Sequence, residues 1–123
     1  MELRRKVNVF ISSKCDDKYK IVRLALKKLI EETGIALAYC YEAEPASSKN
    51  GISAYLQEID KCDLFVLLVD NNDGVSDAVL KEFMRAKSNK KRTLCFFCNE
   101  KCTQMTEFQK DIIDNQYCKY KEV

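Results

Sequence analysis

The chain has 123 residues, 46% of them apolar and 33% charged, and its formal charge is only +2. This composition excludes a wholly disordered chain, and the near balance of basic and acidic residues argues against a nucleic-acid partner. The length suits a single domain over residues 1–123. Since no apolar run reaches the ~20 residues of a membrane span and no secretory signal is recognisable, we expect no membrane association and a cytoplasmic location.

Apolar strand-like runs alternate with amphipathic helical patterns along the chain. In chain order the patterns predict a strand at 6–12, a helix at 16–33, a strand at 35–41, a loop at 42–51, a helix around 52–59, a strand at 63–69, a helix at 76–87, a strand at 93–98, a helix at 103–115 and an edge strand at 117–121. In the first helix the apolar stripe expected to face the sheet is Val22, Ala25, Leu26 and Leu29.

This alternation indicates an α/β domain built from right-handed βαβ units. Residues 63–69 (DLFVLLV) are the strongest strand and have no polar face, as a central parallel strand requires. We therefore predict a flavodoxin-like, three-layer fold with a parallel sheet of four to five strands. The expected strand order is 2-1-3-4-5, with the first and third strands central.

The chain contains seven cysteines and no histidine. Without histidine, Ser-His-Asp and Cys-His catalysis and the common histidine-based metal centres are excluded. Cys95, Cys98 and Cys102 have a metal-like spacing, but Cys95 and Cys98 fall in one strand and project to opposite faces. We expect all seven cysteines to be reduced, unbridged and free of metal. Any chemistry must then use carboxylates, hydroxyls, thiols, lysine or backbone dipoles.

Ligands of such folds bind beyond the carboxyl ends of the strands. Here that edge would carry Ser12, Ser13 and Lys14 after the first strand, the 42–51 loop, and residues 70–76 after the third strand. The candidate substrate-binding residues are Ser12, Ser13, Lys14, Asp70 and Ser76.

Glu82 is the most unusual residue of the helix at 76–87. It lies seven residues after Val75 and four before Ala86, on the side where Val79 and Phe83 face the sheet. A buried carboxylate must be paired, protonated or exposed to a cleft, so Glu82 is either a partner of a lysine such as Lys81 or Lys14 or a functional group.

Three short segments resemble TIR domains. The first is Asn8 to Ser13 (NVFISS), the second runs from Leu56 to Val69, and the third is Ser76 followed six residues later by Glu82 and Phe83. A closer match is a TIR-like family of unknown function at the N-termini of STAND-type NTPases and bacterial antiphage proteins. Its features include an arginine in the first helix, here Arg23, and a helix motif that matches Val79, Glu82, Phe83 and Ala86.

Arg23 itself falls with Lys20 and Lys27 on the outer side of the first helix, where we expect a solvated charge. The chain also departs from TIR receptors in two places. Ala78 stands where a bulky aromatic is common, and residues 42–46 replace the receptors' Arg-Asp-x-x-Pro-Gly loop.

The resemblance implies an N-terminal effector domain of a longer defence protein that cleaves the nicotinamide–ribose bond of NAD or a related nucleotide. Glu82 would be the catalytic carboxylate, NAD would be a substrate, and no resident cofactor or metal is implied. Nicotinamide is a good leaving group, which suits a site without histidine. Expected partners are a second copy or a downstream STAND-type NTPase domain. The alternatives are a non-catalytic interaction and oligomerisation module, and a nucleoside deoxyribosyltransferase-like enzyme with Glu82 as nucleophile.

Overall fold

Strands and helices alternate without exception in the computed structural model of the chain, which describes residues 6–14, 17–40, 51–71, 76–99 and 104–122. The strands are β1 (Val7–Ser12), β2 (Ala36–Tyr39), β3 (Leu64–Val69), β4 (Arg92–Phe97) and β5 (Lys119–Glu122). The helices are α1 (Asp17–Glu32), α2 (Gly51–Lys61), α3 (Asp77–Ser88) and α4 (Glu107–Asn115). No described helix has the length and apolarity needed to cross a lipid bilayer.

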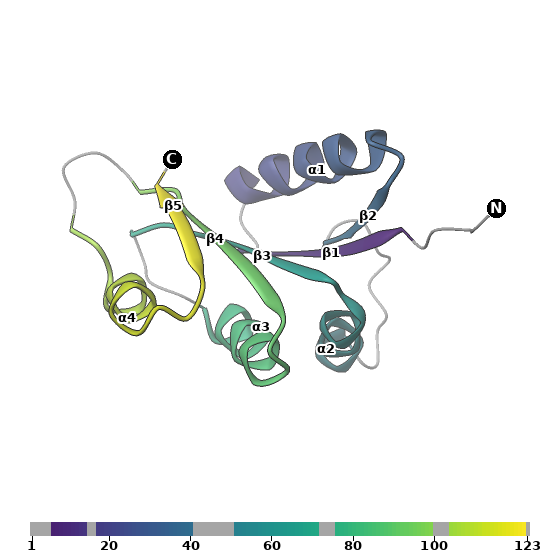
Figure 1. Cartoon of the computed structure of the whole chain (residues 1–123). Helices are drawn as coiled ribbons and strands as arrows, with labels where there is room; N and C mark the ends of the chain where they lie inside the picture. Colours follow the sequence, from purple (N-terminus) through teal and green to yellow (C-terminus); the bar gives the residue numbers. More distant parts are fainter. Residues whose placement is uncertain (1–5, 15–16, 41–50, 72–75, 100–103, 123) are drawn as a thin grey trace.

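The five strands form one parallel sheet in the order β2-β1-β3-β4-β5. This confirms the predicted flavodoxin-like arrangement, with β1 and β3 inside the sheet (Figure 1). β3 is flanked by β1 and β4 and is buried along almost its whole length, as its unbroken apolar sequence requires. The switch point, where the chain order reverses, lies between β1 and β3.

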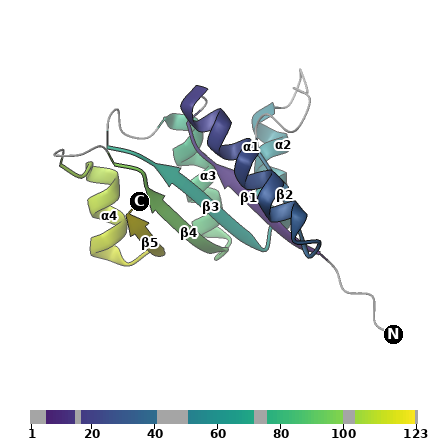
Figure 2. The ribbon, with the colours of Figure 1, turned by 90° about the horizontal axis from the view of Figure 1, so that it is seen from above.

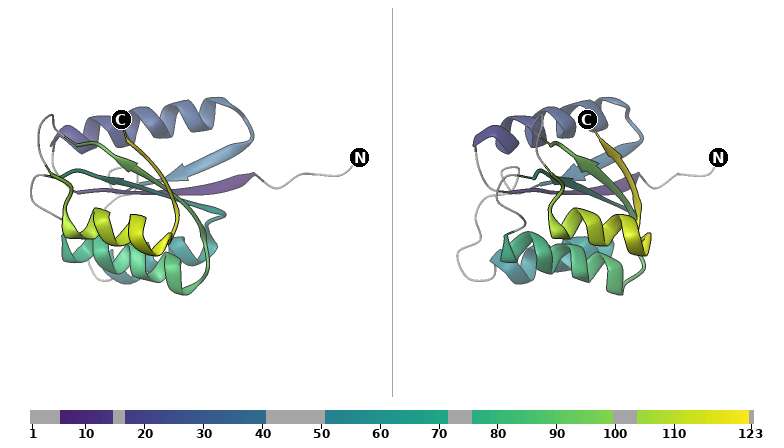
Figure 3. Two further views of the ribbon diagram at one scale, coloured as in Figure 1. Left: turned by 60° about the vertical axis from the view of Figure 1, so that its left-hand side comes forward. Right: turned by 90° about the vertical axis from the view of Figure 1, so that its left-hand side faces the viewer.

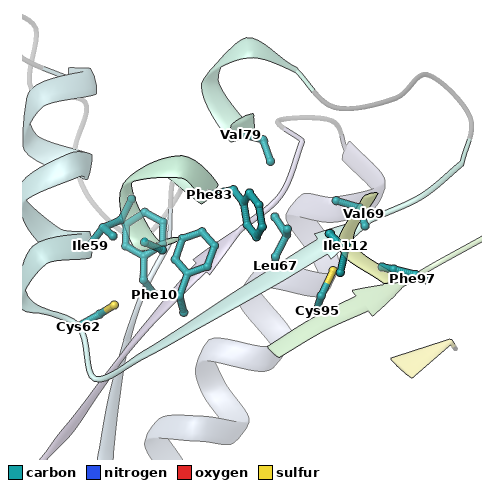
Figure 4. Packing of buried hydrophobic residues seen from close by; sticks show 12 residues of the cluster. Phe10, Ile59, Cys62, Leu67, Val69, Val79, Phe83, Cys95, Phe97 and Ile112 are labelled. Atoms are coloured by element: carbon teal, nitrogen blue, oxygen red, sulfur yellow. The ribbon is translucent and has the colours of Figure 1, made fainter. Parts of the chain in front are cut away.

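Three layers are visible when the sheet is viewed from the side (Figure 3). α1 covers one face, and α2, α3 and α4 cover the other (Figures 1 and 3). The larger core lies under those three helices, where Phe10, Leu67 and Phe97 of the sheet meet Ile59 of α2 and Phe83 of α3 (Figure 4). The smaller core lies under α1, which runs over the β1 and β2 side of the sheet (Figure 2).

The buried side of α1 agrees with the predicted one at Val22 and Leu26, which pack on the smaller core, and differs from it at Ala25 and Leu29. Ala25 and Leu29 are exposed, Leu29 at 62%, whereas Tyr19 and Arg23 are each only 1% exposed. The helix is apolar on more than one side, so its apolar residues alone do not determine which side packs. Packing is instead set by a face that starts at Tyr19 and Arg23 and continues through the partly buried residues Val22, Leu26 and Ile30.

α4 begins later than predicted, at Glu107 rather than near residue 103. The Thr106 side chain accepts a hydrogen bond from the Gln109 N–H (3.1 Å), and the Gln109 side chain accepts one from the Thr106 N–H (3.2 Å). This reciprocal capping box ends the preceding loop and starts the helix at residue 107.

The outer edge of β2 is closed by two side chains of α1. Lys27 Nζ donates to the Ala38 carbonyl at 2.7 Å, and Glu31 Oε2 accepts from the Ala38 N–H at 3.1 Å. Lys27 and Glu31 also bind each other at 2.8 Å, and these bonds lower the pKa of Glu31. Lys27 and Glu31, one helical turn apart, therefore form an ion pair that also occupies backbone groups that an edge strand usually leaves open.

Two leucine substitutions test the burial pattern. Leu67→Ala, at a fully buried position of β3, should lower the free energy of unfolding by about 2–5 kcal/mol because it leaves a cavity. Leu29→Ala, on the exposed side of α1, should change it by less than about 0.5 kcal/mol. Denaturant unfolding measures both, and a large loss in Leu29→Ala would contradict this orientation of α1.

Candidate active site

The predicted site residues gather where β1 and β3 end. Ser12 is the last residue of β1, Ser13 and Lys14 follow it directly, and Asp70 follows β3. Ser12 and Ser13 are buried, as is Asp70. Because parallel strands end at the same edge of the sheet, these side chains share one end of the molecule with the start of α3.

α3 directs Glu82 toward the end of β1. Val79, Phe83 and Ala86 of this helix are buried against the sheet, as predicted, and Glu82 lies beside them with its side chain half-buried. Arg85 one turn later holds α3 to α2 through two bonds to Asp60, at 2.8 and 2.6 Å. The rotation of α3 is therefore set by apolar packing on one side and by this ion pair at its far end.

Glu82 is bound by a hydroxyl rather than by a cation. Ser12 Oγ donates to Glu82 Oε1 at 2.6 Å, and no described lysine or arginine forms an ion pair with this carboxylate. Burial raises the pKa of Glu82, and this effect is opposed by the Ser12 hydrogen bond and by the positive charge of Arg23. The expected structural pairing of Glu82 with Lys14 is not formed; Lys14 binds Asp70.

Arg23 lies on the opposite face of the sheet from Glu82 and is buried, so its predicted solvation is wrong. Its guanidinium donates to the Ser13 hydroxyl and to the Lys14 carbonyl. Ser12 and Ser13 are successive residues at a strand end, and they project to opposite faces. Consequently α1 and α3 each hold one of the two serines.

Asp70 links α1 to the ends of β1 and β3. Its Oδ1 accepts from Lys14 Nζ at 3.0 Å, and its Oδ2 accepts from the Tyr19 hydroxyl at 2.9 Å. The sequence placed Lys14 and Asp70 at one edge, as observed, but gave no indication of Tyr19 and pointed to a solvated Arg23. A usable signal was their spacing of four residues, which puts a hydroxyl and a guanidinium on one side of α1 near its start.

Ser76 has a structural role and is separate from the other candidate residues. It is exposed and caps α3, where its hydroxyl accepts from the Val79 N–H at 3.3 Å. No hydrogen bond joins Ser76 to another candidate residue within the described ranges. The 42–51 loop falls almost wholly outside the described residues, as do residues 72–75.

A hollow of about 310 Å³ opens along the β2 edge, away from these residues. It is lined by Lys27 and Glu31 of α1 and by Glu58 and Lys61 of α2, and contains none of the candidate residues. Its charges bind each other, Lys27 to Glu31 at 2.8 Å and Lys61 to Glu58 at 3.9 Å. The hollow thus presents no unpaired charge of one sign to a ligand.

The cysteines in the described part of the chain are free thiols: Cys40, Cys62, Cys95, Cys98 and Cys118. Cys15 and Cys102 lie outside the described residues. Burial raises the pKa of Cys62 to about 11, which makes it a poor nucleophile at neutral pH. Within the same part of the chain, no group of cysteine and acidic residues has the geometry to hold a metal ion.

The family model described as "Domain of unknown function (DUF4062)" matches residues 8–122 of the chain. Among solved structures, the CMP N-glycosidase BcmB of Clostridium botulinum is similar with a TM-score of 0.62 at 16% identity, over 94% of this chain and 86% of its own. The SEFIR domain of IL-17 receptor B has a TM-score of 0.66 at 10% identity, over 98% and 88%.

The rubredoxin oxygen:oxidoreductase of Desulfovibrio gigas has a TM-score of 0.57 at 15% identity, over 94% of this chain and 28% of its own. No curated protein sequence matches. At these identities the likeness shows the fold alone, and the names of the three proteins describe three unrelated tasks. The arrangement of the flavodoxin-like and TIR-like fold is thereby supported from independent structures, and function must be argued from the site.

Glu82 should make stability depend on pH in a defined direction. Its pKa is raised in the folded protein, so the native state binds the proton more readily than the unfolded chain, and stability is lost as pH rises through the folded pKa. Glu82→Gln should therefore unfold at higher urea concentration than the wild type at pH 7.5, and this gain should shrink toward pH 4.

Glu107→Gln, at an exposed glutamate, is the matched control and should show no such gain. A Glu82→Gln variant that is less stable than the wild type at pH 7.5 would contradict the burial cost assigned to this carboxylate.

Proposed function

Because the chain belongs to the DUF4062 family and carries a half-buried carboxylate at the ligand edge of its sheet, we propose that it is an N-glycosidase. Its proposed substrate is NAD or a related nucleotide, cleaved between the base and the ribose. The observation that carries the proposal is Glu82, which is held by Ser12 at 2.6 Å without a cation on it. Burying a carboxylate in this way is costly, and such costs concentrate at functional sites.

The chemistry needs little more than this carboxylate. The bond between ribose C1′ and the base nitrogen breaks, and the leaving base keeps the electron pair, which neutralises the positive charge of a nicotinamide ring. Positive charge then develops on the ribose as an oxocarbenium ion, and the Glu82 carboxylate stabilises it electrostatically. Water adds its oxygen to C1′ and loses a proton, which goes to the solvent when the base is nicotinamide and to the departing base when it is cytosine.

The Ser12 hydrogen bond has a direct role in this scheme. It lowers the pKa of Glu82 against the effect of burial, and so favours the ionised carboxylate that the scheme requires. It also fixes Oε1, which leaves Oε2 for the hydroxyls or the developing charge of a ribose. Lys14 and Asp70 lie at the same strand ends and are the proposed substrate-binding groups, whereas Ser13 is held by Arg23 on the other face.

The reaction class has support from one structure of the same fold, whose name identifies it as a CMP N-glycosidase. That name concerns a pyrimidine nucleotide, so the base and the nucleotide of the present chain must be established by experiment. We further propose that the domain acts as the effector of a longer defence protein and cleaves its nucleotide when that protein is activated.

Incubating the concentrated protein with NAD, and separately with CMP, tests the proposal. We expect release of nicotinamide or cytosine by the wild type, and a fall of at least about 100-fold in Glu82→Ala, the scale of losing a group that stabilises transition-state charge. Glu32→Gln, at an exposed glutamate at the other end of the sheet, should retain activity. Base release that survives Glu82→Ala would refute the assignment of the carboxylate.

A second candidate function is a non-catalytic module that acts by association. The observation in its favour is the outer side of α1, where Ile21 is 71% exposed and Leu24 and Leu29 are exposed as well. Apolar side chains gathered on one side of a helix mark contact surfaces more often than scattered ones do. This function makes no use of Glu82.

Sedimentation over a range of concentrations tests this second candidate. If α1 mediates self-association, the double variant Ile21→Gln, Leu29→Gln should weaken the dimer at least about tenfold, because central apolar contacts carry most of an interface's energy. Lys20→Gln, an exposed change on the same helix, should leave association unchanged. Equal association of the double variant and the wild type would exclude α1 as the contact.

A further inference from the structure

Two adjacent serines at the end of β1 are held from opposite faces of the sheet by ions of opposite charge. Ser12 binds the Glu82 carboxylate of α3 on one face. Ser13 binds the Arg23 guanidinium of α1 on the other face. The backbone between these side chains is shared, so movement of one serine is transmitted to the other.

Arg23 differs from a surface arginine in its burial and in its hydrogen bonds. It is 1% exposed, and its guanidinium donates to the Ser13 hydroxyl and to the Lys14 carbonyl. A guanidinium remains charged at any working pH, so its burial is tolerated only with such hydrogen bonds. These hydrogen bonds fix Ser13 and Lys14, the first two residues after β1.

The same helix is anchored a second time, one turn earlier. The Tyr19 hydroxyl donates to Asp70 Oδ2 at 2.9 Å, and Asp70 also accepts from Lys14 Nζ at 3.0 Å. The first two turns of α1 thereby contact the residues that follow both β1 and β3. Of the charged groups at these strand ends, Lys14 and Asp70 bind each other.

We propose that Arg23 is a positioning residue for Glu82: it holds the Ser13–Lys14 backbone so that the Ser12 hydroxyl stays aimed at the carboxylate. This inference rests on the proposed function for its catalytic meaning. Its physical basis is the pair of hydrogen bonds that Ser12 and Ser13 form on opposite faces of the sheet. The positive charge of Arg23 also lowers the pKa of Glu82.

A purely structural arginine would behave differently. Removing it would loosen α1 and lower stability, and would shift the titration of Glu82 only through the loss of its charge, so Ser13→Ala, which keeps that charge, would leave the titration unchanged. A positioning arginine links the two quantities, because loss of its charge and of its hold on Ser13 both disfavour the ionised carboxylate. The titration of Glu82 therefore separates these roles without reference to activity.

The experiment follows the Glu82 carboxyl carbon by NMR as pH is varied in protein labelled at glutamate carboxyls, with Glu82→Gln identifying the signal. In Arg23→Gln the titration midpoint of Glu82 should move to higher pH, and in Arg23→Lys, which keeps the positive charge, it should move less. Lys20→Gln removes the same charge from an exposed position of the same helix and should leave the midpoint unchanged.

Ser13→Ala provides a milder variant if Arg23→Gln does not fold. It removes one bond of the guanidinium and keeps the charge, and the Glu82 midpoint should move upward by a smaller amount. An unchanged midpoint in Ser13→Ala would overturn the proposal.

Activity gives a second readout with a separate meaning. If NAD or CMP is hydrolysed, Arg23→Gln should reduce kcat by about tenfold or more with little change in KM, because misplacement of a reacting group costs rate rather than binding. A wild type that hydrolyses neither substrate would count against the proposed function, while the titration would still decide the role of Arg23. A rise in KM with kcat unchanged would count against positioning.

Discussion

Successive residues of a strand project to opposite faces, and at the end of β1 this alternation divides one site between two helices. Ser12 projects with Phe10 toward α3, and Ser13 projects with Ile11 toward α1. A shift of β1 by one residue would turn each serine to the opposite face, and at most one of the two ions would then meet a serine hydroxyl. The register of β1 against β2 and β3 therefore determines the site as well as the core.

Much of the fold was predictable because its signals are local and redundant. Helices alternate with apolar runs, β3 has no polar face, and Glu82 interrupts an otherwise apolar side of α3. The packing of α1 was not predictable in the same way, because apolar residues occur around most of this helix and Arg23 shares its spacing with lysines. What selects the packed side is the hydrogen bonding of Tyr19 and Arg23 to strand ends distant in sequence, which no periodicity contains.

The candidate site illustrates how one fold supports different tasks. Similar sheets carry a nucleotide N-glycosidase, a receptor domain and an oxidoreductase, so the layers and strand order are compatible with all three. The distinguishing feature here is a half-buried carboxylate whose partner is a hydroxyl, with its stabilising cation on the other side of the sheet. A direct salt bridge would have stabilised Glu82 more fully, and would also have occupied the oxygen assigned to the substrate in the proposed function.

The closure of β2 limits how copies of this domain can join. Two sheets merge edge to edge only when the incoming strand finds open N–H and carbonyl groups, and at Ala38 both are taken by Glu31 and Lys27. Because the pKa of Glu31 is lowered, the pH must fall below the usual range of a glutamate before Glu31 is protonated and its bonds to Lys27 and to the Ala38 N–H are weakened. At Ala38 an incoming strand therefore finds neither backbone group open at neutral pH, which disfavours growth of a continuous sheet at that point of the edge.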